Sequence, residues 1–294
     1  MPSQRAHIKR LIEVRKLASA YGEAGYEDRA YRVSACGKTY SFYVCTECGQ
    51  FCYLQEYQCG DRLCPLCARR RVARLLQNYG GLLKGLKGAR MVTVSLPSKA
   101  LGQLHLAVKE LWNAFTRLRH RAIWKVVRGA IASLEITFNP KDKTWHPHLH
   151  VVVDSEFIPW IKIREAWREV TGGLGQAVYI QKCRRGWHRE LIKYVTKVAD
   201  LMKSPEALRE FYKWSRNKRF IRTYGTLYNA AVEKEELHHD IRCRGCGAVM
   251  KLEKQCCIIS DVYGEAVSFV IDNRAGPRGV STYTGRSMVQ GAYA

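Results

Sequence analysis

The run 145–154, WHPHLHVVVD, constrains the fold most, because it joins a histidine cluster directly to β-branched apolar residues. This composition predicts a strand that enters a hydrophobic core. Side chains alternate between the two faces of a strand, so His148 and His150 share one face while Leu149 and Val151 share the other. Two imidazoles placed two residues apart can hold a divalent metal ion. The alternative is that they form hydrogen bonds to nearby carboxylates and phosphates.

A second strand is predicted over 131–138, IASLEITF, where polar and apolar residues also alternate and Glu135 lies on the polar face. The connector 139–144 is rich in turn-forming residues, so the two strands most simply pair as an antiparallel hairpin. That hairpin would bring Glu135 beside His148 and His150. Two imidazoles and a carboxylate leave positions open on a metal ion, which is typical of a catalytic site. Alternatively, Glu135 is an exposed carboxylate on a strand.

The charge of the chain indicates a polyanionic partner. Forty-nine Lys and Arg residues against 26 Asp and Glu residues give a net charge of +23. Nucleic acid is the expected partner, and a solvated basic surface is the alternative. The 294 residues are 47% hydrophobic, which is enough for a folded core. The sequence shows neither a membrane-spanning run nor the pattern of a secretory signal, so we expect a cytoplasmic protein.

Twelve cysteines in a reducing compartment indicate structural metal rather than disulfides. The clearest spacing is Cys45-x2-Cys48-x15-Cys64-x2-Cys67, which is typical of a four-thiolate zinc site. A redox role for the last pair is the alternative. The same region also contains Cys36, Cys52 and Cys59, so a different set of four cysteines can be the zinc ligands.

The C-terminal part of the chain admits a second zinc site. Its spacing is less regular than that of the first site. The four cysteines of this group are Cys243, Cys246, Cys256 and Cys257.

Three segments are basic and suited to DNA. Residues 3–20 predict a basic amphipathic helix that docks on the protein or faces DNA. Residues 204–236 look helical and mix aromatic with basic side chains, which suits either base stacking or a packed helical layer. A third helix follows the cysteine knuckles and is predicted to lie against phosphates, with a solvated helix face as the alternative. Its arginines are Arg69, Arg70, Arg71 and Arg74.

Residues 187–202 predict another amphipathic helix. Glu190, Tyr194 and Lys197 lie along one edge of its apolar stripe, at spacings of one and two helical turns. The phenol could therefore face a site beside the sheet, with an ammonium and a carboxylate as neighbours. The alternative is a tyrosine at the edge of the core with a flanking salt bridge.

Four motifs follow one another along the chain, CGDRLCPLC at 59–67, MVTVSL at 91–96, HPHLH at 146–150 and KYVTK at 193–197. Their order resembles the HUH endonuclease superfamily, and within it the single-tyrosine replication initiators of rolling-circle plasmids. The likeness runs from about residue 36 to 203. Rolling-circle transposases share a similar knuckle and histidine pair and are one alternative. A non-catalytic, zinc-dependent DNA-binding regulator is another.

The resemblance implies an α+β fold with a mostly antiparallel, ferredoxin-like sheet, helices on one side and the histidine strand near the centre. We expect five segments along the chain. They are a basic helix (1–35), a zinc module with a basic helix (36–87), a nuclease domain (88–203), a basic aromatic region (204–240) and a small cysteine module (241–294).

The resemblance also implies roles for the site residues. Tyr194 would attack a phosphodiester to give a 5′-phosphotyrosine and a free 3′ hydroxyl. Lys197 would position or polarise the reacting groups, and Glu190 would activate water at termination. The expected partners are single-stranded or melted origin DNA and a host helicase and polymerase, in the cytoplasm of a prokaryotic cell, with Zn²⁺ in the cysteine sites. The expected ligands of a catalytic Mn²⁺ or Mg²⁺ are His148, His150 and Glu135.

Overall fold

The computed structural model describes residues 4–55, 58–84, 86, 88–175, 177–183, 198–228, 242–243, 245–260, 266–270 and 281–282. The helices are α1 (Gln4–Glu23), α2 (Glu27–Ser34), α3 (Pro65–Lys84), α4 (Leu104–Arg119), the 3-10 helix η1 (Ala122–Val126), α5 (Trp160–Val170), α7 (Val198–Leu201) and α8 (Pro205–Ser215). The strands are β1 (Thr39–Cys45), β2 (Phe51–Gln55), β3 (Ala89–Ser95), β4 (Lys99–Ala100), β5 (Val127–Asn139), β6 (Thr144–Ser155), β7 (Val178–Lys182), β8 (Ile221–Gly225), β9 (Met250–Ser260), β10 (Ala266–Val270) and β11 (Ser281–Thr282).

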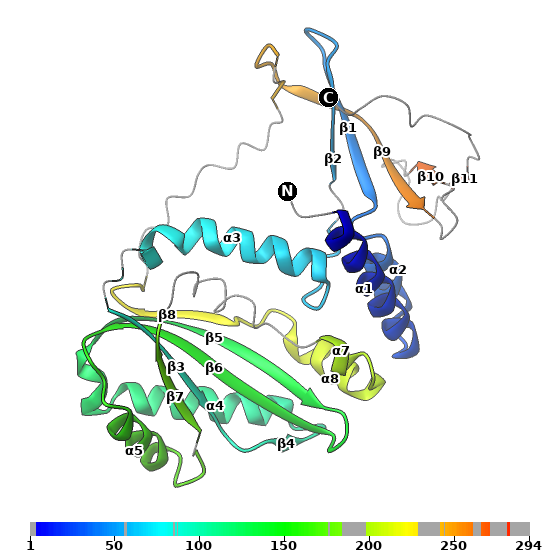
Figure 1. Cartoon of the computed structure of the whole chain (residues 1–294). Helices are drawn as coiled ribbons and strands as arrows, with labels where there is room; N and C mark the ends of the chain where they lie inside the picture. Colours follow the sequence, from blue (N-terminus) through cyan, green and yellow to red (C-terminus); the bar gives the residue numbers. More distant parts are fainter. Residues whose placement is uncertain are drawn as a thin grey trace.

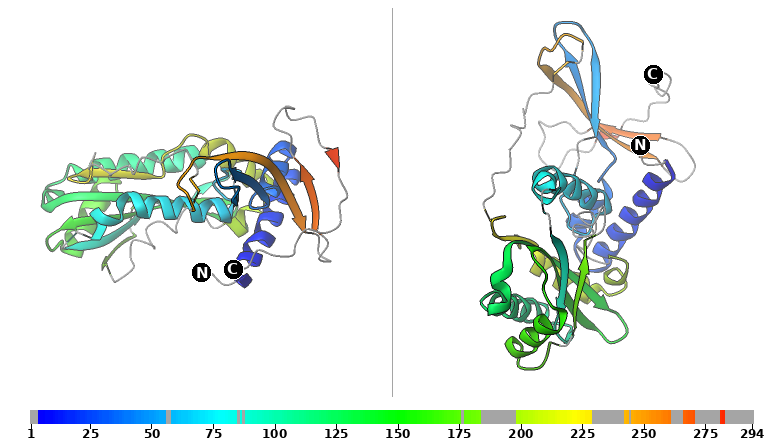
Figure 2. Two further views of the ribbon diagram at one scale, coloured as in Figure 1. Left: turned by 90° about the horizontal axis from the view of Figure 1, so that it is seen from above. Right: turned by 60° about the vertical axis from the view of Figure 1, so that its left-hand side comes forward.

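Two antiparallel sheets organise these elements (Figure 1). The larger sheet has the order β7-β3-β6-β5-β8, with β4 paired to β6, and the smaller sheet has the order β11-β10-β9-β1-β2. Figure 2 shows the smaller sheet beyond one end of the larger one. The prediction of an α+β fold built on an antiparallel sheet is confirmed.

The hairpin of β5 and β6 forms the centre of the larger sheet. Its register pairs Glu135 with His148 and Ser133 with His150, which brings Glu135 beside the histidines as predicted. The turn is closed by Asn139, whose side-chain oxygen accepts a hydrogen bond from the backbone N–H of Lys141. Both predicted strands and their antiparallel pairing are therefore confirmed.

The main core lies on the face of the sheet that is opposite the histidines. There, apolar side chains of β5 and β6, such as Leu134 and Leu149, pack with the buried stripe of α4 and with α5 and α8. Glu210 of α8 ties these layers together, because its carboxylate accepts hydrogen bonds from the backbone N–H of Leu104 and from the indole N–H of Trp145. The helix α4 ends at Arg119, and the 3-10 helix η1 follows it before β5 begins.

One basic segment that was expected to be helical contains a strand. The helix α8 ends at Ser215, and β8 then pairs with β5 at the edge of the larger sheet. The two backbones approach closely where Gly129 meets Gly225, since a side chain at Gly225 would collide with the carbonyl oxygen of Arg128. A continuous helix over 204–236 is thus wrong, because pairing with an open sheet edge outweighs the weak helical pattern of this stretch.

The two segments that we expected as separate cysteine modules share the smaller sheet, in which β1 pairs with β9. The expected N-terminal helix is present as α1, and it packs by Val14 and Leu17 into the main core, so it docks on the protein.

The buried carboxylate of Asp61 joins this helix to the cysteine loop. The hydroxyl of Tyr21 donates a hydrogen bond to Oδ2 of Asp61 at 2.9 Å, and Arg29 forms an ion pair with the same oxygen at 2.7 Å. Burial and the adjacent carboxylate raise the pKa of Tyr21, so its phenol stays protonated and donates.

The helix α3 lies on the other side of the larger sheet from α4 and α5 (Figure 1). Its residues Val72 and Tyr79 pack against a small apolar cluster that contains Met91 and Val152. Because Met91 and Val152 are on the histidine face of the sheet, α3 covers one end of that face. The helices α4, α5 and α8 thus share one face of the larger sheet, and α3 from the preceding segment packs on the other. No helix in the described ranges is both long enough and apolar enough to span a membrane.

Candidate active site and cysteine clusters

The three histidines of β6 share one face of the larger sheet, because they are two residues apart on a strand. The ring centroids of His146 and His148 are 4.2 Å apart, and those of His148 and His150 are 6.4 Å apart with nearly parallel planes. The side chains between them, Pro147 and Leu149, are buried on the opposite face. The alternation of this strand thus separates a row of imidazoles from the core.

Glu135 and His150 are in direct contact. The Nε2 atom of His150 lies 2.8 Å from Oε2 of Glu135, and its Nδ1 atom lies 3.1 Å from the hydroxyl oxygen of Thr93 on β3. Only 13% of the His150 side chain and 10% of the Glu135 side chain is exposed. Because an ionised carboxylate only accepts hydrogen bonds, this contact requires the form of His150 that carries a proton on Nε2. Glu135 is therefore not an exposed strand carboxylate.

His146 extends the row at the end nearest the hairpin turn. Burial lowers the pKa of His146, although the nearby Glu135 carboxylate and a backbone hydrogen bond at Leu96 oppose this shift. A lowered pKa favours the neutral imidazole, which is the form that binds metal ions. The sequence places this third histidine on the same face of the strand. Its spacing alone does not distinguish a metal ligand from a polar residue that only begins the strand.

The donor set fits a divalent ion in its chemistry, since neutral imidazole nitrogen and carboxylate oxygen both suit Mn²⁺. The side chains are not gathered around one point, however. Within the part of the chain that the structure describes, only the two cysteine groups below bring three or more ligand atoms within 4.8 Å of one another. An ion shared by His148, His150 and Glu135 would replace the proton on His150 and would require rotation of a side chain.

The other predicted catalytic residues, Glu190, Tyr194 and Lys197, lie outside the described residues. The described residues that precede and follow the segment 184–197 both contact the larger sheet. Before it, the backbone N–H of Cys183 donates to the carbonyl of Ala89 at 3.1 Å, at the start of β3. After it, α7 packs beside β5 and buries Leu201 in the main core.

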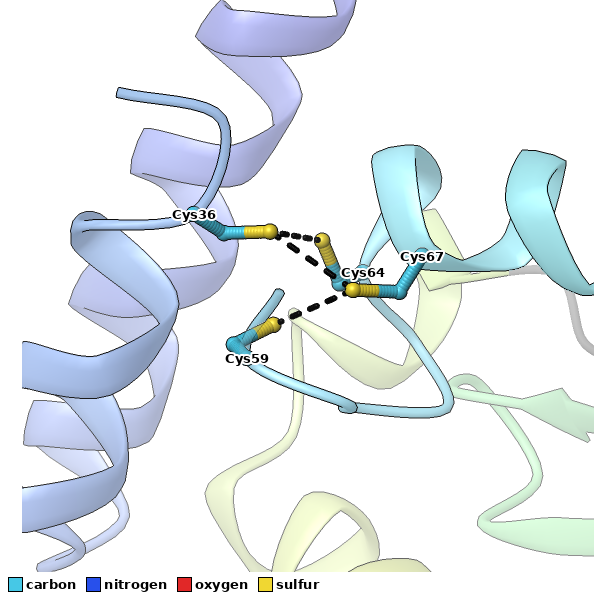
Figure 3. Close-up of side chains that lie close together, drawn as sticks. All are labelled: Cys36, Cys59, Cys64 and Cys67. Atoms are coloured by element: carbon cyan, nitrogen blue, oxygen red, sulfur yellow. Dashed lines mark hydrogen bonds between the residues drawn. The ribbon is translucent and has the colours of Figure 1, made fainter. Parts of the chain in front are cut away.

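A first cysteine cluster forms where the loop before α3 meets the end of α2 (Figure 3). The cluster consists of Cys36, Cys59, Cys64 and Cys67. Their sulfur atoms are 3.6 Å apart in the pairs Cys36–Cys67, Cys59–Cys67 and Cys36–Cys64. Four sulfurs around a tetrahedral zinc with Zn–S bonds of ~2.3 Å are about 3.8 Å apart. All four residues are buried, and this group can hold zinc.

A second cluster brings together cysteines that are far apart in the sequence. It consists of Cys45, Cys48, Cys243 and Cys246. The sulfur atoms are 3.4 Å apart in the pair Cys45–Cys246 and 3.5 Å apart in the pair Cys48–Cys243. Hydrogen bonds from the backbone N–H groups of Cys246 and Gly245 lower the pKa of Cys243 to about 7, which favours the thiolate that binds zinc.

The predicted grouping of Cys45 and Cys48 with Cys64 and Cys67 is therefore wrong, because these two pairs belong to different clusters. The predicted C-terminal set is also divided, since its first two cysteines join the second cluster. Cys256 and Cys257 lie on β9, paired in register with β1.

A signal for the correct grouping is present in the sequence. Both Cys-x-x-Cys pairs of the second cluster are followed by glycine, and both glycines have positive φ angles, 67° at Gly49 and 75° at Gly247. Each glycine donates its backbone N–H to the carbonyl of the first cysteine in its knuckle, at 2.9 Å in both cases. The two knuckles are thus equivalent halves of one site. The pair Cys64–Cys67 has no such glycine, which separates it from them.

The arginines of α3 do not all face solvent. Arg69 and Arg74 are exposed on the helix. Arg71 instead donates to the backbone carbonyls of Asp61 at 3.0 Å and Arg62 at 2.6 Å. Arg71 is thus occupied in holding the cysteine loop, whereas Arg69 and Arg74 are exposed cations of α3.

Comparison with known proteins identifies the family. The chain matches the family model described as "Replication protein" over residues 52–244, more than half of its length. It is 32% identical over 146 residues to "Protein rep" of Streptococcus pneumoniae serotype 2, covering 47% of this chain and 45% of that protein. It is 26% identical over 163 residues to "Protein rep" of Staphylococcus aureus, covering 49% of this chain and 71% of that protein.

A third relative, "Protein rep" of Bacillus amyloliquefaciens, is 28% identical over 143 residues, which cover 47% of this chain and 42% of the relative. The chain thus spans less than half the length of the first and third of these relatives. No solved structure matches it significantly. The family match includes both the histidine strand and the first cysteine cluster except Cys36, and on this basis the chain belongs to the replication protein family.

Proposed function

We propose that this protein initiates DNA replication by cutting one DNA strand with Tyr194 as the nucleophile. The observation that carries the proposal is the contact between His150 and Glu135 on the histidine face of the central hairpin, in a member of the replication protein family. His148 lies opposite Glu135 in the register of the same hairpin. We infer that these three side chains hold a Mn²⁺ or Mg²⁺ ion beside the scissile phosphate.

The chemistry follows from the resistance of phosphodiesters to attack. Their charged oxygens repel nucleophiles, and a bound divalent ion would offset that charge. An unperturbed phenol has a pKa near ~10, so Tyr194 needs help to lose its proton, and the ammonium of Lys197 would favour the phenolate. Attack by the phenolate on phosphorus would form the phosphotyrosine bond and release the 3′ oxygen, which takes up a proton to become a hydroxyl.

That 3′ hydroxyl would prime a polymerase, and the phosphotyrosine conserves the energy of the broken bond for later rejoining. A second cut at termination needs a second nucleophile. We assign this role to water activated by Glu190, which precedes Tyr194 by one helical turn in the predicted helix.

The anchoring of the segment 184–197 supports this arrangement. Cys183, just before it, packs with the apolar cluster on the histidine face, and α7, just after it, packs beside β5. β5 is the strand that carries Glu135. The described residues on both sides of the segment thus contact the larger sheet.

The charge distribution supports a DNA partner at the same face. The exposed Arg69 and Arg74 lie on α3, which packs over one end of the histidine face. Cations at that position would neutralise phosphates of a strand that crosses the sheet. We propose single-stranded or melted origin DNA as the substrate, with Zn²⁺ in the two cysteine clusters as a structural ion, and a host helicase and polymerase as later partners.

An adduct assay tests the proposal. The purified chain would be incubated with Mn²⁺ and labelled single-stranded oligonucleotides that tile the DNA molecule carrying its gene. We expect a protein–DNA adduct that survives denaturation and that Tyr194→Phe abolishes. Tyr179→Phe is the matched control, because Tyr179 is 68% exposed and pairs in register with Thr93, which contacts His150.

Two outcomes would contradict the proposal. If Tyr194→Phe still forms the adduct and Tyr179→Phe does not, the nucleophile is on β7 instead. If the wild-type chain binds the oligonucleotides but forms no adduct with Mn²⁺ or Mg²⁺, the protein is a zinc-dependent DNA-binding regulator rather than a nuclease.

A further inference from the structure

A cavity of about 240 Å³ lies on the face of the larger sheet opposite the histidines. Its walls come from α4, from the end of α8 and from the stretch that leads into β8. Leu134 of β5 lines it, whereas the next residue, Glu135, points to the histidine face. The cavity is therefore separate from the candidate active site, although both use the same strand.

Four cations surround this cavity, and they are Lys109, Lys218, Arg219 and Arg222. All four side chains belong to exposed residues. None of them forms an ion pair with a carboxylate of the described residues, although several other basic residues of the chain do. Positive charge that is concentrated around a hollow and not neutralised by the protein favours an anionic ligand.

Two tryptophans complete the lining. The guanidinium of Arg222 lies 4.0 Å from the ring centroid of Trp112, so a cation and an aromatic ring are already stacked at the wall. Trp214 lines the cavity from α8 and is only partly buried. Aromatic rings with adjacent cations are the combination that binds single-stranded nucleic acid, since the rings stack on bases and the cations neutralise the backbone.

These positions also bear on the two predictions for the basic aromatic region 204–236, which were base stacking and a packed helical layer. Phe211 and Phe220 are buried in the main core, so part of the region is a packed layer. Trp214, Lys218 and Arg219 are directed to the cavity instead. The region thus combines both uses, with its packed residues supporting those that line the hollow.

The loop of the first cysteine cluster braces one wall. Arg62 donates to the backbone carbonyl of Lys218 at 2.9 Å, and its guanidinium lies 4.0 Å from the ring centroid of Phe220. These contacts fix the turn that carries Lys218 and Arg219 before any ligand binds. A wall that is already ordered loses less entropy on binding than a mobile one.

We propose that this cavity is a second DNA site, which binds one nucleotide unit of a single strand away from the point of cleavage. Its volume is below the ~300–1,000 Å³ of typical small-molecule sites, which suits one base with its phosphate rather than a duplex. The inference rests on the proposed function for its ligand, but it concerns a different face of the sheet. It predicts that the cavity contributes to strand affinity without taking part in the cleavage step.

The test compares two triple variants of the full chain. The cavity variant carries Lys109→Gln, Lys218→Gln and Arg219→Gln. The control variant carries Lys125→Gln, Lys162→Gln and Lys213→Gln, which removes the same charge from exposed residues that do not line the cavity. Binding of fluorescein-labelled dT20 and of a 20-base-pair duplex would be measured by anisotropy over a range of salt concentrations, after thermal melting has shown that both variants are folded.

We expect the cavity variant to bind dT20 at least tenfold more weakly than the control variant. Three lost phosphate contacts would also reduce the slope of log K against log salt by about 2, at ~0.7 per contact for a single strand. Duplex binding should differ less than twofold between the two variants. An assay of adduct formation with a short oligonucleotide at saturating concentration should give equal yields for both variants.

Three results would overturn the inference. Equal weakening by both triple variants means that only general charge matters. Equal loss of duplex and single-strand affinity in the cavity variant means that the cavity does not select a single strand. Loss of adduct at saturating DNA places the cations in the cleavage site. A different result would separate the two proposals. If the wild-type chain forms no adduct but dT20 binding still depends on the cavity, the proposed nuclease function is wrong and the cavity site stands.

Discussion

His150 and Glu135 meet across the central hairpin, with 2.8 Å between Nε2 of the imidazole and Oε2 of the carboxylate. Both side chains are at least 87% buried, so water competes little for either group. A carboxylate in this position can contribute to a metal site as a ligand or by orienting the histidine. In either case we expect its negative charge to strengthen metal binding.

Replacing Glu135 by glutamine tests that charge. The amide is nearly the same size and can still contact His150, but it is neutral. We expect Glu135→Gln to weaken Mn²⁺ binding by roughly 10–100-fold. Electron paramagnetic resonance of free Mn²⁺ measures this without DNA, and Glu165→Gln on the exposed side of α5 is the control. Unchanged Mn²⁺ affinity in Glu135→Gln would remove Glu135 from the metal site.

The cysteine clusters predict a zinc content of two ions per chain. Cys59→Ser should remove the ion of the first cluster, and Cys243→Ser that of the second, so each variant should retain about one. Cys183→Ser is the control and should retain both, because Cys183 is in neither cluster. Elemental mass spectrometry of the purified proteins gives the count. Two ions in Cys59→Ser would restore the grouping of Cys45 and Cys48 with Cys64 and Cys67.

Substitutions of Arg71 and Arg69 should have different effects, the first on stability and the second on DNA binding. Arg71→Gln loses two charge-assisted hydrogen bonds to backbone carbonyls, so we expect the free energy of unfolding to fall by about 1–3 kcal/mol. Arg69→Gln, on the exposed side of α3, should change it by less than about 0.5 kcal/mol but should weaken DNA binding. Urea unfolding with excess zinc measures the first effect. Equal stability of the two variants would show that Arg71 does not hold the cysteine loop.

Asp61 should be a larger contributor to stability. It is 2% exposed, and Asp61→Asn would leave Arg29 without its anionic partner. We expect a loss of about 3 kcal/mol in the free energy of unfolding. Asp200→Asn breaks a surface pair with Lys203 and should cost at most about 1 kcal/mol. Comparable losses in the two variants, measured by urea unfolding, would contradict the role of Asp61 in joining α1 and α2 to the cysteine loop.

The sequence predicts the central hairpin because strand periodicity is local. Alternation along 131–138 and 145–154 assigns each residue to a face, and a short turn joins the two strands. The sequence therefore predicts Glu135 beside His148 and His150 without fixing the register, and the structure pairs Glu135 with His148. The strand β8 is missed because its residues have no strong period of their own, and its conformation depends on the free edge of β5.

The grouping of cysteines cannot be obtained from spacing alone. Cys48 and Cys243 are 195 residues apart, and their meeting depends on the pairing of β1 with β9. Spacing identifies ligand pairs, but it does not say which pairs share an ion. The role of Arg71 is hidden for a similar reason, because a run of arginines on a helix does not show which one faces a neighbouring loop.

The most direct test of the proposed site is to identify the residue that forms the covalent bond to DNA. The adduct formed with Mn²⁺ and a single-stranded oligonucleotide would be digested and analysed by tandem mass spectrometry. We predict a nucleotide phosphate on Tyr194, and we predict no modified peptide when His148 and His150 are both replaced by alanine or when the metal is chelated. His120→Ala, at an exposed histidine outside the site, should leave the modification intact. A nucleotide on any other residue, or one that persists in the double-histidine variant, would contradict the proposed site.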